Sequence, residues 1–429
     1  MEKQTTQMSL TSARIGEQYT KVQHSSGLTM LLYPMEGYNS AYALFATKYG
    51  SVDNTFKTDT DPDFVTVPEG IAHFLEHKMF ECEDGDAFAK YAKTGASANA
   101  YTSFDRTAYL FSCTENFKES LEILLDFVSR PYFTPETVQK EQGIIGQEIK
   151  MYEDNPDFRV YFNLLRAMYH NHPLSIDIVG TVDTIAQIDA DLLYRCYHTF
   201  YSLSNMVLCI AGSFDPAEVL AVADGILKPA EPVTIERGET PEPATVCRDT
   251  IEQLLPVAQP LFHVGFKLPP SATEADNMAN NIRDEILVNV IAGESTPLYR
   301  RLYDSGLINA EFSCEAMAGR DYCLSIFGGE SREPEKVRDE IVAEVARLQK
   351  EGIDPETFAR YRKVLYGDYV GLFGRVESVA SLLLTCHFSD FEAYRVLEAI
   401  AAVTLEDVQG RLNQAYNVAH CALSVVKAS

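Results

Sequence analysis

The sequence lacks long hydrophobic runs, an excess of basic residues and paired cysteines. Nowhere do about 18 apolar residues follow one another, so we expect no membrane-spanning helix. The formal net charge is −26, which argues against nucleic acid or an anionic membrane as a partner, because phosphate binding needs Lys and Arg in excess. No GxGxxG or P-loop stretch indicates a nucleotide-binding enzyme.

The nine cysteines are scattered along the chain, and no two form a CxxC pair. This odd, scattered set is typical of reduced thiols, so we expect a cytoplasmic protein rather than a disulfide framework. The polar N-terminus, residues 1–27, has no apolar stretch of signal-peptide length. Cys82 lies close to a pair of histidines and could be an extra metal ligand or a redox-sensitive thiol, but a buried structural cysteine is the simpler interpretation.

The length of 429 residues exceeds one compact core of usual size, so we expect two domains. The clearest linker candidate runs from Leu227 to Asp249, since it holds several prolines and acidic residues and no sustained apolar period. We therefore predict an N-terminal domain over residues 1–228, a linker over 229–249 and a C-terminal domain over 250–429.

An internal repeat supports this division. The segment "TIAQIDADLLYRCYHTFYSLSNMVLCIAG" aligns without gaps on "AIAAVTLEDVQGRLNQAYNVAHCALSVV" near the C-terminus. Ile185 pairs with Ile400 and Leu208 with Leu423, and both pairs are separated by 215 residues (400 − 185 = 423 − 208). Each copy has the pattern of a helix, a short turn and a buried strand. We infer two similar α/β halves of roughly equal size.

The stretch "HFLEH" contains the residues with the clearest chemical consequence. On a helix, His73 and His77 are about 40° apart around the axis and project from one face. Two imidazoles so placed can bind one zinc ion, and Glu76 lies near enough to touch a zinc-bound water without being a ligand. This is the inverzincin order HxxEH. The alternative is three polar residues on a helix face.

A catalytic zinc usually has three protein ligands and an open position. The best source of a third ligand is "QKEQGIIGQEIKMYEDNP", where Glu141 and Glu148 are seven residues apart and share a helix face. One carboxylate could bind zinc while the other orients a histidine. Taken alone, the pair would be a solvated glutamate face of an amphipathic helix, with Ile144, Ile145 and Ile149 in apolar contact.

The motifs "HFLEH", "GASANAYTSFDRTAYLF", "EQGIIGQE" and "HPLSIDIVGT" occur in an order that resembles the pitrilysin-type (inverzincin) zinc peptidases. The similarity extends over nearly the whole chain and is greatest to bacterial members that resemble mitochondrial processing peptidase. The resemblance implies an α+β fold of two homologous domains, each an antiparallel-rich sheet backed by helices. It also implies that pairs of such chains enclose a chamber that admits unfolded peptides.

The resemblance also assigns roles to single residues. His73 and His77 match the zinc histidines, Glu148 the third ligand and Glu76 the general base, which implies one Zn²⁺ per chain. Glu141 matches a carboxylate that orients a histidine without binding the metal.

Asn99 and Ala100 match an edge strand that binds the substrate backbone, because an unpaired strand edge can accept an extended peptide as an added strand. From the sequence alone, Asn99 could equally be a turn residue. His170 and His172 are interpreted as structural or surface residues.

The sequence departs from the family at a second motif. Active members usually supply an Arg and a Tyr from a stretch resembling L-R-x-x-x-G-L-x-Y, whereas here Tyr303 and Asn309 stand at those places. Arg300 or Arg301 could replace the Arg. Because such groups stabilise the oxyanion, a homologous partner chain is expected to provide them.

Two functions follow from these observations. The first is a zinc-dependent endopeptidase that hydrolyses peptides or small unfolded proteins in a chamber, as the catalytic subunit of a homo- or heterodimer. The alternative is a largely non-hydrolytic peptide-binding or assembly subunit. The intact HxxEH favours the enzyme, and the missing Arg and Tyr favour the alternative. A structural zinc site is a weaker interpretation, because such sites usually have four protein ligands.

Overall fold

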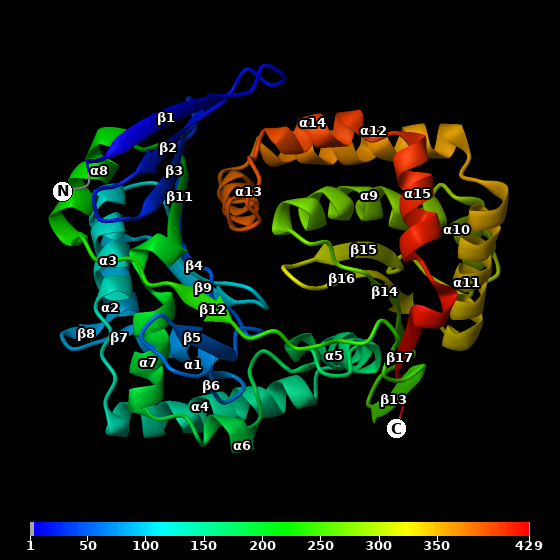
Figure 1. Cartoon of the computed structure of the whole chain (residues 1–429), viewed down its shortest axis with the longest axis horizontal. Helices are drawn as coiled ribbons and strands as arrows, with labels where there is room; N and C mark the ends of the chain where they lie inside the picture. Colours follow the sequence, from blue (N-terminus) through cyan, green and yellow to red (C-terminus); the bar gives the residue numbers. More distant parts are fainter. Residues whose placement is uncertain (1–3, 429) are drawn as a thin grey trace.

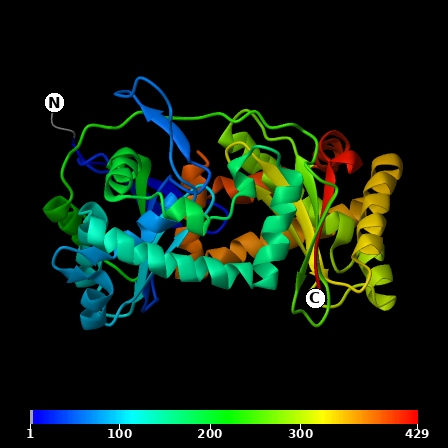
Figure 2. The same cartoon turned by 90° about the horizontal axis from the view of Figure 1, so that it is seen from below.

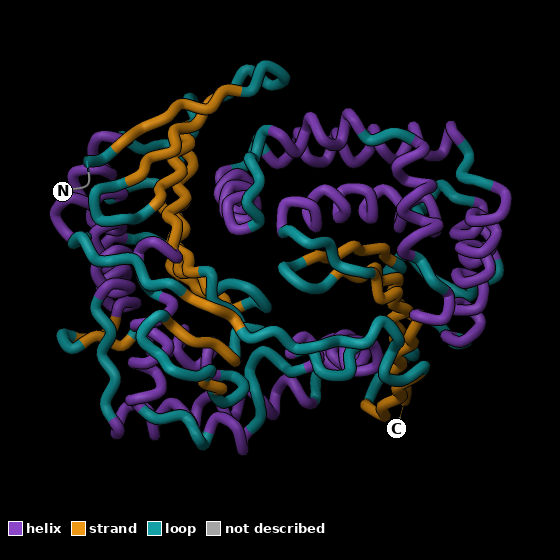
Figure 3. The backbone as a smooth tube through the Cα atoms, in the orientation of Figure 1, coloured by secondary structure: helices purple, strands orange, loops and turns teal. Residues whose placement is uncertain are grey.

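The computed structural model describes residues 4–428 and contains two large sheets with helices around them (Figures 1 and 3). The first sheet has seven strands in the order β1-β2-β3-β11-β4-β10-β9. These strands are β1 (Thr6–Thr11), β2 (Gln18–Gln23), β3 (Thr29–Pro34), β4 (Ala41–Thr47), β9 (Ser97–Thr102), β10 (Thr107–Cys113) and β11 (Met206–Gly212). The helices of the same half are α1 (Ile71–Met79), α2 (Ala87–Thr94), α3 (Phe117–Ser129), α4 (Pro135–Glu153), α5 (Pro156–Met168), α6 (Val182–Ile185), α7 (Ala190–Phe200) and α8 (Pro216–Ile226).

The second sheet has five strands in the order β13-β17-β14-β16-β15. They are β13 (Thr250–Leu255), β14 (Leu261–Leu268), β15 (Ser313–Ala318), β16 (Cys323–Glu330) and β17 (Cys421–Ala428). The helices of this half are α9 (Glu274–Ala292), α10 (Pro297–Asp304), α11 (Pro334–Glu351), α12 (Pro355–Leu372), α13 (Val376–Phe388), α14 (Arg395–Ala402) and α15 (Leu405–Ala415). Two small ribbons, β5 (Thr55–Thr58) with β6 (Val65–Thr66) and β12 (Ile235–Arg237), and β7 (Glu81–Cys82) with β8 (Gly85–Asp86), complete the strands described.

The two sheets repeat one topology, as the sequence repeat predicts. In the first sheet β11 lies parallel to β3 and antiparallel to β4, and β10 is antiparallel to β4 and β9. In the second sheet β17 lies parallel to β13 and antiparallel to β14, and β16 is antiparallel to β14 and β15. Helices α7 and α15 have the same length. The starts of these helices, and the starts of the strands β11 and β17 that follow them, are separated by the same 215 residues as the sequence repeat. The predicted α+β fold of two similar halves is confirmed.

The halves exchange a helix. Helix α5 of the first half packs on β13, β14 and β17 of the second sheet, and α13 of the second half packs on β3, β4 and β11 of the first. One apolar core therefore includes strand residues of the first sheet, such as Tyr33, Leu44 and Cys209, together with Leu383 of α13. The burial of apolar area across the halves holds them together. The division at 1–228 and 250–429 stays a prediction.

The segment predicted as a linker crosses from one half to the other along the molecule (Figure 2). It is in contact with both halves. In the first half β12 pairs with β5, and the Glu242 carboxylate accepts hydrogen bonds from the backbone of His170, Asn171 and His172. In the second half the Lys267 ammonium on β14 donates a hydrogen bond to the same carboxylate. The composition of the segment does not encode these attachments, and its bounds as a linker stay a prediction.

No single helix within residues 4–428 is long and apolar enough to cross a membrane, although α12 and α13, bent by 110° relative to each other, pass that test as a pair by length and composition.

Candidate metal centre

Helix α1 presents the HFLEH residues from within the core of the first half. Its apolar residues Ile71, Ala72, Phe74, Leu75 and Met79 are buried, which fixes the rotation of the helix. The helix begins after Gly70, whose φ of 88° is left-handed and whose added Cβ would lie 2.6 Å from the carbonyl oxygen of Val179. Glycine is therefore required where α1 starts.

Helix α4 supplies the carboxylates. It starts with a capping box at Thr134 and a proline at its first turn, both typical of a helix N-terminus. Ile145 and Ile149 are buried as expected, whereas Ile144 is 46% exposed, so the prediction that all three isoleucines make apolar contact is wrong.

Three potential ligands from the two helices converge. His73 Nε2 lies 3.6 Å from Glu148 Oε1, and His77 Nε2 lies 3.5 Å from Glu148 Oε2. The ligand atoms of His73, His77 and Glu148 all lie within 4.8 Å of one another. Ligands about 2.1 Å from a tetrahedral zinc ion are about 3.4 Å apart, so these side chains fit that ion. Two imidazoles and one carboxylate are also the donor set of several catalytic zinc sites.

Glu141 lies behind His77, as the resemblance implies. His77 Nδ1 donates a hydrogen bond to Glu141 Oε1 over 3.0 Å, which leaves Nε2 with its lone pair. Burial by itself would lower the pKa of His77, but the hydrogen bond to Glu141 and the charges of Glu76 and Glu148 raise it. Burial, with the charge of His77, lowers the pKa of His73 to about 3, so His73 is neutral at physiological pH, as a metal ligand must be.

Glu76 projects beside this group and is not one of the three converging ligands. It is 8% exposed, and burial raises its pKa, although a hydrogen bond from Thr102 and the charge of His77 offset part of that rise. Thr102 Oγ1 donates to Glu76 Oε2 over 2.6 Å. The site therefore contains a buried carboxylate that can exchange a proton, next to three groups able to hold a cation.

Asn99 and Ala100 lie on β9, at the edge of the first sheet. Within the described chain, β10 is the only strand that pairs with β9, so the other edge of β9 is open. Ala98, Ala100 and Thr102 are partly buried and alternate with exposed residues, and α1 packs against the strand. Asn99 is a strand residue rather than a turn residue, and its side chain accepts a hydrogen bond from the Ala100 N–H.

The residues at the second motif lie far from the candidate site of their own chain. Helices α1 and α10 lie in opposite halves of the molecule (Figure 1). Tyr303 is 45% exposed, and Asn309 donates a hydrogen bond to Glu330. Arg300 and Arg301 are exposed as well and form ion pairs within the second half. None of these four residues belongs to the metal centre within one chain.

Cys82, His170 and His172 lie outside the group formed by His73, His77 and Glu148. Cys82 is partly buried and lies outside the group of converging ligands. His172 is buried and accepts a hydrogen bond from the Leu174 N–H, while His170 is exposed, which confirms both as structural or surface residues.

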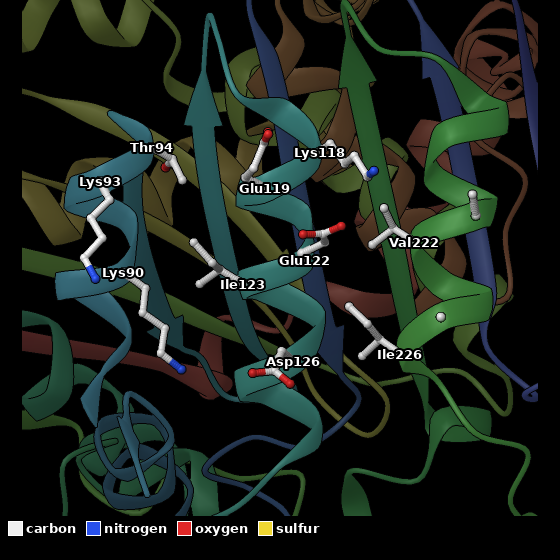
Figure 4. A pocket seen from close by; sticks show the side chains of 12 residues that line it. Lys90, Lys93, Thr94, Lys118, Glu119, Glu122, Ile123, Asp126, Val222 and Ile226 are labelled. Atoms are coloured by element: carbon white, nitrogen blue, oxygen red, sulfur yellow. The ribbon is translucent and has the colours of Figure 1, made fainter. Parts of the chain in front are cut away.

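A cavity of about 710 Å³ opens between α2, α3 and α8 (Figure 4). Lys90, Lys93 and Lys118 surround it together with the carboxylates Glu122 and Asp126. No residue of the metal centre lines this cavity, so it is separate from the candidate site.

Two site residues were missed by the sequence analysis. Strand alternation places Thr102 on the same face of β9 as Ala100, two positions earlier, but it does not show that this face meets Glu76. Tyr152 follows Glu148 by four residues on α4, and its partly buried ring stacks on Phe158 with 4.4 Å between ring centroids. Burial raises the pKa of Tyr152, and the nearby charge of Glu148 raises it further.

The fold and the site define a two-fold repeated α+β protein with a candidate metal centre in its first half. The family model "Insulinase (Peptidase family M16)" matches residues 67–182, and "Peptidase M16 inactive domain" matches residues 187–365. A curated relative, the uncharacterised zinc protease YmfH of Bacillus subtilis (strain 168), is 41% identical over 394 residues, which are 91% of this chain and 92% of the relative. The chain belongs to the M16 family of metallopeptidases, which includes pitrilysin.

More distant relatives and solved structures agree. The probable mitochondrial-processing peptidase subunit beta of Arabidopsis thaliana is 27% identical over 228 residues, 51% of this chain and 42% of that protein. The crystal structure of a putative M16-like peptidase from Alicyclobacillus acidocaldarius covers all of both chains with a TM-score of 0.90 at 36% identity. Pitrilysin shares the fold over 99% of this chain and 47% of its own, with a TM-score of 0.73 at 17% identity.

Proposed function

We propose that the protein is a zinc-dependent endopeptidase. The observation that carries the proposal is the convergence of His73, His77 and Glu148, with the buried Glu76 beside them. His73 and His77 would hold the ion through Nε2 and Glu148 through its carboxylate, one ion per chain. Several relatives are named as zinc proteases, which supports zinc as the metal.

Glu76 and Glu141 would have separate roles in peptide hydrolysis. When bound, zinc supplies Lewis-acid chemistry, which polarises a carbonyl and lowers the pKa of water. Glu76 accepts the proton of the attacking water and delivers it to the leaving amine. Glu141 keeps the His77 ring in the orientation that binds the metal.

The open edge of β9 would hold the substrate. An extended peptide can add to this edge through main-chain hydrogen bonds, which depend little on its sequence. Asn99 and Ala100 lie at the middle of that edge, so the peptide would lie next to α1 and the metal centre. This arrangement suits unfolded peptides and excludes folded proteins, whose strands are already paired.

We further propose that the active form contains a second, homologous chain. Pitrilysin is about twice as long as this chain, because the chain covers 47% of it. The processing peptidase relative is named as a subunit. In a pair, the α10 region of one chain would face the site of the other, and a partner with Arg and Tyr in place of Tyr303 and Asn309 would complete it. The cytoplasm is the proposed compartment, supported by nine free thiols.

The alternative function is a peptide-binding or assembly subunit with little hydrolysis. Tyr303 and Asn309 favour it, because two donors that would stabilise the oxyanion are missing. It differs from the endopeptidase in turnover and not in zinc binding.

One experiment separates the two. The zinc-loaded chain is incubated with unstructured peptides of varied charge, and the products are read by mass spectrometry, with Glu76→Gln and a chelator as controls. Cleavage that both controls abolish supports the endopeptidase and shows that one kind of chain suffices. Bound zinc without cleavage supports the alternative or the need for a partner. Cleavage by the complex with a copurifying homologous chain then distinguishes them, because only the endopeptidase requires Glu76 of this chain for that cleavage. A chain that binds no zinc contradicts both.

A further inference from the structure

The orientation of Glu76 depends on a single residue of the edge strand. The Thr102 hydroxyl donates to Glu76 Oε2 over 2.6 Å, and within residues 4–428 no hydrogen bond is made to Oε1. One oxygen of the carboxylate is thus held by β9, and the other is free to exchange a proton. Because Glu76 is buried in α1, this bond also ties α1 to the strand.

The neighbouring hydroxyl of Thr107 takes no part in this hydrogen bond. Thr107 of β10 is the register partner of Thr102, and the two hydroxyl oxygens are 3.5 Å apart. Thr107 donates its proton to the carbonyl oxygen of Tyr49 over 2.9 Å. The proton of Thr102 is therefore the one directed to Glu76, whose carboxylate is the strongest acceptor nearby.

Thr102 also lies on the strand proposed to bind the peptide. It is two residues after Ala100 on the same face of β9, at the end of the strand. A peptide added to the open edge restrains the backbone of β9, and Thr102 is restrained with it. The hydroxyl then holds the Glu76 carboxylate in one place during the proton transfer.

We propose that Thr102 is a positioning residue that sets the orientation of Glu76 and couples it to peptide binding on β9. This inference rests on the proposed peptidase function. We therefore expect that loss of the Thr102 hydroxyl lowers kcat while KM and zinc affinity stay unchanged, because Thr102 contacts Glu76 and none of the three metal-binding side chains.

The test compares three variants. Thr102→Val keeps the branched shape and removes the hydroxyl, Thr102→Ser keeps the hydroxyl, and Thr107→Val removes the adjacent hydroxyl that does not reach Glu76. For Thr102→Val we expect kcat to fall about 10- to 100-fold, as for other residues that orient catalytic groups. Thr102→Ser should retain most of kcat, and Thr107→Val should lower thermal stability but not kcat.

A second readout does not depend on cleavage. Co²⁺ replaces zinc in each variant, and its visible absorption reports the surroundings of the metal. Thr102→Val should change this spectrum and Thr107→Val should not, with equal zinc affinity in both. An unchanged spectrum and an unchanged kcat in Thr102→Val overturn the inference, even if the wild type cleaves. A wild type that binds neither ion overturns the proposed function instead.

Discussion

His77 Nδ1 and Glu141 Oε1 are 3.0 Å apart, and this hydrogen bond joins the helix of the HFLEH motif to the helix that carries Glu148. Glu141 is only 14% exposed, so its charge is poorly screened by water. The contact selects the His77 tautomer whose Nε2 can bind metal. It also keeps α1 and α4 at the distance at which His73, His77 and Glu148 converge.

Replacement of Glu141 should therefore weaken zinc binding without removing a ligand. For Glu141→Ala we expect zinc affinity to fall about 10- to 100-fold, because residues that orient a metal-binding histidine typically contribute that much. The zinc affinity of Glu141→Gln should lie between those of the wild type and Glu141→Ala, since the Gln amide oxygen can still accept a hydrogen bond from His77 Nδ1. Competition with a chelator measures the affinity, and Glu136→Ala on the exposed start of the same helix is the control. Equal zinc affinity in Glu141→Ala and Glu136→Ala would falsify this role.

Tyr152 should support Glu148 in the same way. Tyr152→Phe keeps the ring and its stacking on Phe158 but removes the phenol beside the carboxylate. We expect zinc affinity to fall several-fold with no loss of thermal stability, because a metal-binding carboxylate is itself held by hydrogen bonds. Tyr132→Phe, away from the metal centre, is the matched control. If both variants bind zinc like the wild type, Tyr152 packs beside the site without supporting it.

Local spacing predicts the part of the site that lies on one helix. His73, Glu76 and His77 fall on adjacent turns, so their proximity needs no knowledge of the fold. Glu148 is different, because the helix pattern shows that it shares a face with Glu141 but not which element that face meets. The resemblance supplied that pairing, and the distances between α1 and α4 agree with it.

Contacts between distant elements could not be derived from periodicity. Thr102 reaches Glu76 because β9 crosses α1, and no pattern within either segment encodes that crossing. Likewise, the apolar faces of α5 and α13 indicate that each helix is buried, but the connections before and after it decide that each packs on the sheet of the other half. Ile144 fits the apolar pattern of α4 and is nevertheless exposed. The face of α4 that packs on the core includes Ile145 and Ile149 but does not extend to Ile144.

Glu242 should make the protein sensitive to acid. Burial alone would raise its pKa, but the N–H groups of His170, Asn171 and His172 and the Lys267 ammonium outweigh it and hold the pKa below its usual value. A lowered folded-state pKa means that the stabilisation is present above the unfolded value of about 4.3 and is lost as the pH falls through the folded one.

Glu242→Gln should accordingly destabilise the chain by about 2–4 kcal/mol at pH 7, because the Lys267 charge loses its buried partner. Urea unfolding with a chelator present measures this without a contribution from bound metal. The difference from wild type should shrink toward pH 3, and the exposed Glu239→Gln should change stability little at either pH. A wild type and a Glu242→Gln variant of equal stability at pH 7 would contradict the role of this carboxylate.

Glu285 should have the opposite pH dependence. Burial on α9 raises the pKa of Glu285 to about 7, with the charge of Asp284 adding to the rise and hydrogen bonds from Tyr369 and Asn281 reducing it. For a carboxyl whose folded-state pKa is raised, stability is greatest below the unfolded value of about 4.3 and is lost as the pH rises toward 7. Above that pH the folded chain carries a buried charge that the unfolded chain hydrates freely.

Glu285→Gln removes that charge while its amide oxygen still accepts from Tyr369 and Asn281. We expect the variant to be more stable than wild type by about 1–2 kcal/mol at pH 8, since partial solvent access screens part of the shift. At pH 5, where the wild-type carboxyl is protonated, the two should unfold at nearly the same temperature. Thermal unfolding of the metal-free chains at both pH values tests this, and a stabilisation of equal size at pH 5 and pH 8 would show that packing, and not the charge of Glu285, is responsible.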